Sequence, residues 1–132
     1  GRVFISSEGD IPDEWRDLAF QVPANRLHDA LALSDLFIGD SQTMAAEAAC
    51  LGVPNIRVST FAGRISYLQE LESRYGLTQA FHPGEEAKIL QRLEDYLTSS
   101  QAREQLAAGH RRLLEDKKNI AVWYVDFLEG LT

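Results

Sequence analysis

The chain has 132 residues, 45% hydrophobic and 25% charged, which suits one globular domain and excludes a disordered or collagen-like chain. Twenty acidic and thirteen basic residues give a formal net charge of −7, which argues against nucleic acid as a partner. No run approaches the roughly 20 apolar residues that cross a bilayer, and no signal peptide is evident, so we expect a cytoplasmic protein.

The first part of the chain predicts two strands and a helix. Val3 to Ile5 forms a short apolar run, and the alternation from Leu18 to Val22 is typical of a second strand. Pro12 suits the first position of a short helical turn, and a helix is expected from Pro23 to about Ser34. Because the chain enters a strand at once, without an initial methionine, we expect it to be part of a longer protein.

The central segment predicts a strand, a turn, a helix and another strand. Leu36 to Ile38 reads as a strand buried on both faces, and the Ala-rich segment from Gln42 to Leu51 favours a helix that packs closely on a sheet. Gly52 and Pro54 stop this helix, and Asn55 to Val58 forms the next strand. Strands joined in this way are nearly always parallel and bind ligands at their carboxyl ends.

The remaining sequence is mostly helical. A helix is expected from Ile65 to Tyr75, followed by a short extended piece near Ala80 and Phe81. Three further apolar stripes predict a helical C-terminal end, and the last of them is rich in aromatic residues that must be covered by something. The whole pattern indicates one α/β domain over residues 1–132, with a parallel sheet flanked by helices.

The turn at Asp40 to Thr43 is the candidate ligand site. A helix N-terminus presents unpaired N–H groups that suit a phosphate, and Ser41, Gln42 and Thr43 can add hydrogen bonds. Glu47, about one turn further on, can accept hydrogen bonds from sugar hydroxyls. The alternative is that Ser41 or Thr43 only caps the helix and that Glu47 is a solvated surface residue.

The segment HDALALSDLFIGDSQTMAAEAACLGVPNIRV resembles the C-terminal domain of glycosyltransferase-like proteins of the GT-B architecture. It is most similar to the prokaryotic domain of unknown function 354 family, which is related to the non-hydrolysing UDP-N-acetylglucosamine 2-epimerases. The segments FISSEGDIP, STFAGRISYLQELESRYGL and LLEDKKNIAVWYVDFLE extend the resemblance over nearly the whole chain.

This resemblance implies a Rossmann-like domain that binds a UDP-sugar, with no further cofactor, in a glycosyltransferase or sugar-nucleotide epimerase. Ser41 and Glu47 keep the family spacing between the diphosphate and ribose contacts, whereas Gln42 stands where the family usually has glycine. His28 and Arg57 correspond to residues that line the cleft. The other wall of that cleft belongs to an N-terminal domain outside this chain, so we expect this chain alone to bind without turnover.

Other interpretations remain open. Gly39 to Thr43 nearly fits the nucleophile elbow of a serine hydrolase with Ser41 as nucleophile, but Thr43 breaks the pattern. Asp40 as a phosphate acceptor lacks the acidic partners and the lysine that such a site needs. A non-catalytic binding or interaction domain of the same fold is a further alternative, which Gln42 favours, and a homo-oligomer is compatible with the sequence. Cys50 suggests a buried, inert thiol and excludes an internal disulfide, and the three scattered histidines predict no metal site.

Overall fold

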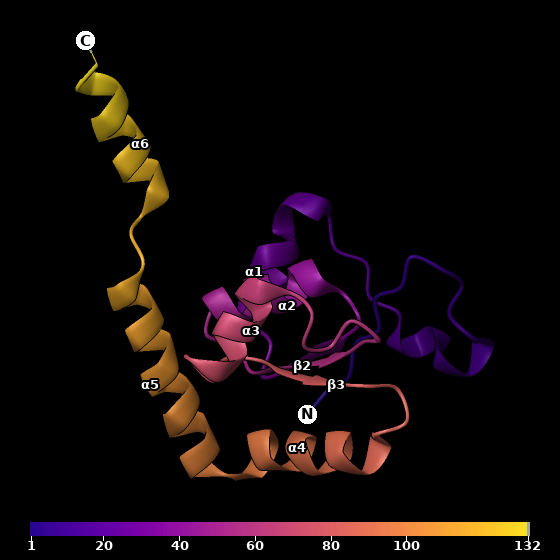
Figure 1. Cartoon of the computed structure of the whole chain (residues 1–132). Helices are drawn as coiled ribbons and strands as arrows, with labels where there is room; N and C mark the ends of the chain where they lie inside the picture. Colours follow the sequence, from indigo (N-terminus) through magenta and orange to yellow (C-terminus); the bar gives the residue numbers. More distant parts are fainter. Residues whose placement is uncertain (132) are drawn as a thin grey trace.

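In the computed structural model, which describes residues 1–131, three parallel strands form the centre of the molecule (Figure 1). They are β1 (Phe37–Gly39), β2 (Asn55–Val58) and β3 (Gln79–Phe81), in the order β1-β2-β3. Ile56 of β2 faces Ile38 on one side and Gln79 on the other. The expected α/β fold with a parallel, Rossmann-like sheet is therefore confirmed.

Helices cover the sheet from two sides (Figure 1). The helices α1 (Leu27–Ala32), α2 (Gln42–Cys50) and α3 (Ser66–Ser73) lie over one face, and α4 (Glu86–Thr98) lies below the other. The long helix α5 (Ser100–Asp116) runs along the side of the domain. Because the three strands are parallel, their carboxyl ends lie at the same end of the sheet, where a loop leads from each strand to the next helix.

Small residues explain how closely α2 approaches the sheet. Ala45, Ala48 and Ala49 are fully buried, and α2 contacts both β1 and β2. Alanine favours helix and leaves little side-chain bulk between the helix and the strands. Gly52 has a positive φ of 75°, so it takes the chain out of the helix in a conformation that favours glycine. The expected helix and its stop signal are both confirmed.

The prediction of two strands before residue 23 is wrong. Residues Asp13–Leu18 form a 3₁₀ helix, and the only pairing is an isolated parallel bridge between Ile5 and Ala19. Val3 and Phe4 are 66% and 54% exposed, so this apolar run is not covered by a helical layer in residues 1–131. An alternating apolar segment forms a strand only where a neighbouring strand pairs with it and its apolar side chains are buried, because most of the stability of a strand comes from pairing and burial.

The other elements lie near their expected positions. β2 has the expected bounds, and the extended piece near Phe81 is a third strand. β1 begins and ends one residue later than expected, and it is not buried on both faces as predicted, because it is an edge strand in which Ile38 is 44% exposed. The helix expected after Pro23 is divided into a 3₁₀ turn at Ala24–Arg26 and α1. Both α3 and the helical C-terminal end are present.

The terminal helix α6 (Ile120–Glu129) extends away from the domain (Figure 1). All its large apolar side chains are exposed, so its aromatic face is not covered by residues 1–131. These residues and the one that follows the helix are Ile120, Val122, Trp123, Tyr124, Val125, Phe127, Leu128 and Leu131. No helix within residues 1–131 is long and apolar enough to cross a membrane.

Candidate functional site

The turn between β1 and α2 lies at the open edge of the sheet. Ser41 is the N-cap of α2, and its Oγ accepts a hydrogen bond of 3.3 Å from the backbone N–H of Met44. The N–H groups of Gln42 and Thr43 have no hydrogen-bond acceptor within residues 1–131. Two first-turn donors are therefore available to a ligand, at the positive end of the helix dipole.

The solvent-facing side of α2 brings three of the expected residues into one region. Thr43 and Glu47 are four residues apart, so both lie on the same face of the helix. His28 of α1 reaches this face, and its Nε2 lies 3.3 Å from Oε2 of Glu47. The side chains of His28 and Glu47 are 65% and 31% exposed, so both remain accessible to a ligand. Asp40, also exposed, begins the turn that leads from β1 to the helix.

The spacing along α2 suits two adjacent groups of one ligand. Glu47 is six positions after Ser41, which corresponds to about 9 Å along a helix axis. The N–H groups at the start can hold an anion, and the Glu47 carboxylate can accept from hydroxyl groups. Its Oε2 faces His28, while its Oε1 makes no hydrogen bond to residues 1–131.

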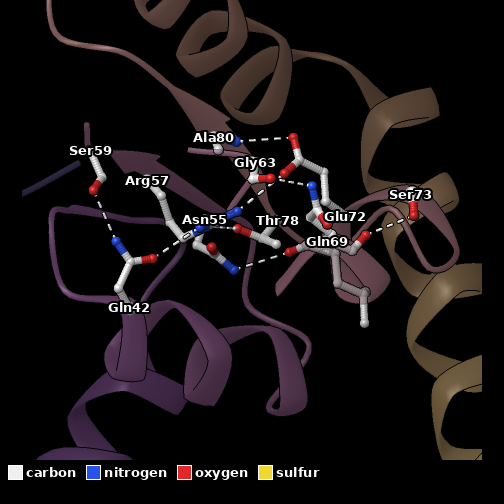
Figure 2. A network of polar contacts seen from close by, with 11 residues as sticks. Gln42, Asn55, Arg57, Ser59, Gly63, Gln69, Glu72, Ser73, Thr78 and Ala80 are labelled. Carbon is white, nitrogen blue, oxygen red and sulfur yellow. Dashed lines mark hydrogen bonds and ion pairs between the residues drawn. The ribbon is translucent and has the colours of Figure 1, made fainter. Parts of the chain in front are cut away.

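Arg57 takes a different position from the other expected residues. It lies on β2 with a side chain only 1% exposed, at the centre of the polar network in Figure 2. Its Nε donates to Thr78 Oγ1 at 3.3 Å, and its Nη2 forms an ion pair with Glu72 Oε2 at 3.1 Å. Its Nη1 donates to Gln42 Oε1 at 3.0 Å. Arg57 thus contacts protein acceptors through all three nitrogens, and its charge is balanced by Glu72.

Gln42 also points into this network. While Oε1 accepts from Arg57, Nε2 donates to Ser59 Oγ at 3.0 Å. Ser59 Oγ in turn accepts from the backbone N–H of Phe61 at 3.1 Å. The Gln42 side chain therefore connects the first turn of α2 with the loop that follows β2, as Figure 2 shows.

Sequence reasoning missed Ser59, Glu72 and Thr78. Ser59 is in a loop without a recognisable motif, and Glu72 is in a helix whose acidic residues have the spacing of a solvated face. The available signal was Arg57 itself, because an arginine inside an apolar strand requires an acidic partner and further acceptors. Glu72 meets this need, and its other oxygen accepts from the backbone N–H of Ala80 at 3.1 Å.

Cys50 is exposed rather than buried, which corrects the expectation from the sequence. It is the last residue of α2, and it follows the buried residues of this helix, which are Ala45, Ala48 and Ala49. Partial burial of the sulfur, and then the negative charge of Glu47, raise the pKa of the thiol. The protonated form is therefore favoured, and we expect low nucleophilicity despite the exposure.

The candidate site is an open surface rather than an enclosed cavity. Two hollows of about 280 Å³ and 440 Å³ lie elsewhere, beside the N-terminal loop and between β3 and α4 respectively. Within residues 1–131, Ser41 Oγ makes no hydrogen bond to a histidine, so the arrangement of a serine hydrolase is not formed. No group of three or more metal-binding side chains occurs in the same described part of the chain.

Comparison with protein-family models, with curated proteins and with solved structures gives no match for this chain.

Proposed function

We propose that this chain is a nucleotide-sugar-binding domain in which the start of α2 holds a diphosphate and Glu47 holds a ribose. The observation that carries this proposal is the pair of unpaired N–H groups at Gln42 and Thr43, on the same helix as an accessible carboxylate. A helix N-terminus binds phosphate through such donors and through its dipole. A UDP-sugar provides an anion and a diol at adjacent positions.

The charges near the turn fit a site that depends on backbone donors. Arg57 is buried against Glu72, so the amides of α2, together with Ser41 and Thr43, are the groups in reach of a phosphate. His28 beside Glu47 can donate to a hydroxyl or phosphate oxygen. Asp40 at the edge can accept from a sugar hydroxyl.

The complete protein would be a glycosyltransferase or a sugar-nucleotide epimerase, with an N-terminal domain as the second wall of the cleft. The resemblance of the central motif supports this part of the proposal. An open surface at the sheet edge is also what one half of a two-walled site would present. We assign no catalytic residue in this chain.

The test is an NMR titration of the ¹⁵N-labelled chain with UDP and with UDP-N-acetylglucosamine. Saturable shifts of the amides from Ser41 to Glu47, weakened by Glu47→Ala, support the proposal. Ser99→Ala is a suitable control, because Ser99 caps α5 far along the chain from the site. No shifts at millimolar ligand would contradict binding by this domain and favour a non-catalytic interaction domain.

A further inference from the structure

We propose that Arg57 and Ser59 act as positioning residues that hold the Gln42 side chain away from the ligand surface of α2. This inference rests on the proposed function and concerns the same site. Gln42 is the first residue of α2, so an unrestrained side chain there can fold back over the N–H groups that would bind the diphosphate.

Two hydrogen bonds fix the Gln42 side chain, and its amide group accepts one of them and donates the other. Arg57 Nη1 donates to Oε1 at 3.0 Å, and Nε2 donates to Ser59 Oγ at 3.0 Å. An amide group bound through both its acceptor and its donor has a fixed orientation as well as a fixed place. Both partners lie on or just after β2, on the sheet side of the helix, and the Gln42 side chain points toward them (Figure 2). At about 100° per residue, Thr43 and Glu47 lie about 100° and 140° around the helix from Gln42, so they belong to a different face.

The partners are themselves fixed. Arg57 is 1% exposed and is held on its other side by Glu72 and Thr78. Ser59 is 8% exposed, its N–H donates to the carbonyl of Phe81 at 3.0 Å, and its Oγ accepts from Phe61. A rigid second layer of this kind keeps a binding surface in one geometry. Arg57 therefore serves the diphosphate site through Gln42 rather than by contact with phosphate.

A rescue experiment separates this role from direct contact. UDP affinity is measured by NMR titration for the wild-type chain, Ser59→Ala, Gln42→Ala and the double variant. Ser59→Ala releases one end of the glutamine, and we expect the Kd for UDP to rise about threefold to tenfold. Gln42→Ala removes the side chain that needs to be held and keeps the backbone N–H, so Ser59→Ala should no longer change the Kd once residue 42 is alanine, and the double variant should bind within about twofold of Gln42→Ala alone.

Arg57→Lys gives a second, independent comparison. Lysine keeps the positive charge but lacks the planar donor arrangement that reaches Gln42, Glu72 and Thr78 together. The positioning role predicts weaker UDP binding by Arg57→Lys and recovery when Gln42→Ala is added. Direct contact with phosphate predicts no recovery. Circular dichroism and the amide spectrum of each variant, with Ser99→Ala as the matched serine control, show whether the fold is retained.

Several results would overturn the inference. It fails if Ser59→Ala binds UDP like wild type, or if Ser59→Ala weakens binding as much in the Gln42→Ala background as in the wild-type chain while the fold is retained. If the wild-type chain does not bind UDP, pyrophosphate is titrated in its place. Binding of pyrophosphate at Gln42 and Thr43 with the same rescue would contradict the nucleotide proposal and leave the positioning role standing. Binding of neither ligand would overturn both.

Discussion

Gly109 is the position where a single methyl group should disturb the fold most clearly. It lies inside α5, where replacement of glycine by alanine normally stabilises a helix by about 1 kcal/mol. At this position, however, a Cβ atom would lie 1.8 Å from the carbonyl oxygen of Tyr75 and 3.0 Å from its carbonyl carbon. The obstacle is backbone, so it cannot rotate away.

The magnitude follows from what has to move. The Tyr75 carbonyl or the whole of α5 would have to shift by more than about 1 Å to restore an ordinary contact. Such a shift loosens Leu106 and Leu113, which are 8% and 6% exposed, and strains the 3.0 Å hydrogen bond between Tyr75 and Asp116. Overpacking of this kind costs about 1–3 kcal/mol, so Gly109→Ala should lower the free energy of unfolding by about that amount.

Urea unfolding followed by circular dichroism measures this effect. Gly130→Ala is the matched control, because within residues 1–131 the nearest atoms to a Cβ at Gly130 would be Asp126 O at 3.4 Å and Phe127 O at 3.5 Å. We expect the control to be neutral or slightly stabilising. A Gly109→Ala chain as stable as wild type would refute the close packing of α5 against the segment before β3.

Three further predictions follow from the polar network, the thiol and the terminal helix. Glu72→Gln should lower the free energy of unfolding by about 3–5 kcal/mol, because it leaves the charge of Arg57, whose side chain is 1% exposed, without its ion-pair partner. Arg57→Met leaves Glu72 instead, whose side chain is 32% exposed and reaches water, and should cost less; equal losses in urea unfolding would contradict this. Glu47→Gln should lower the raised pKa of Cys50 and speed its alkylation by iodoacetamide at pH 8, by less than about tenfold because burial is the larger cause. An unchanged alkylation rate would show that the charge of Glu47 does not reach the thiol. Phe127→Glu on α6 should change the free energy of unfolding by no more than about 0.5 kcal/mol while reducing binding of a hydrophobic dye, since the ring is 49% exposed. A large loss of stability would mean that α6 packs on the domain.

The central unit could be predicted from sequence because its signals are local. The alanines of α2, the stop at Gly52 and the apolar run of β2 each favour one conformation, and together they predict a parallel strand–helix–strand unit. The segments before residue 23 could not be predicted in the same way. Their alternation at Leu18 and Phe20 depends on a partner sheet, and tertiary contacts decide whether a strand forms.

The same distinction between local sequence signals and tertiary contacts applies to the candidate site. Ser41 could be assigned from its place before a helix, and the four-residue spacing places Glu47 on the same face as Thr43. The contact between His28 and Glu47 joins two helices, and that proximity is a property of the fold. Similarly, Glu72 and Thr78 are distant from Gln42 in sequence and meet it only through Arg57. Local patterns thus predict which positions are candidates for contact with a ligand, while the supporting contacts require the structure.

The most direct test of a ribose site at Glu47 compares the binding of UDP with that of its 2′,3′-dideoxy analogue. The Kd of each ligand is determined for the wild-type chain and for Glu47→Ala. If Glu47 accepts hydrogen bonds from the ribose, the wild-type chain should prefer UDP by about tenfold, and this preference should largely disappear in Glu47→Ala, which has no side-chain acceptor. Equal affinity of the wild-type chain for the two ligands, or a preference that Glu47→Ala leaves unchanged, would contradict a ribose site on α2.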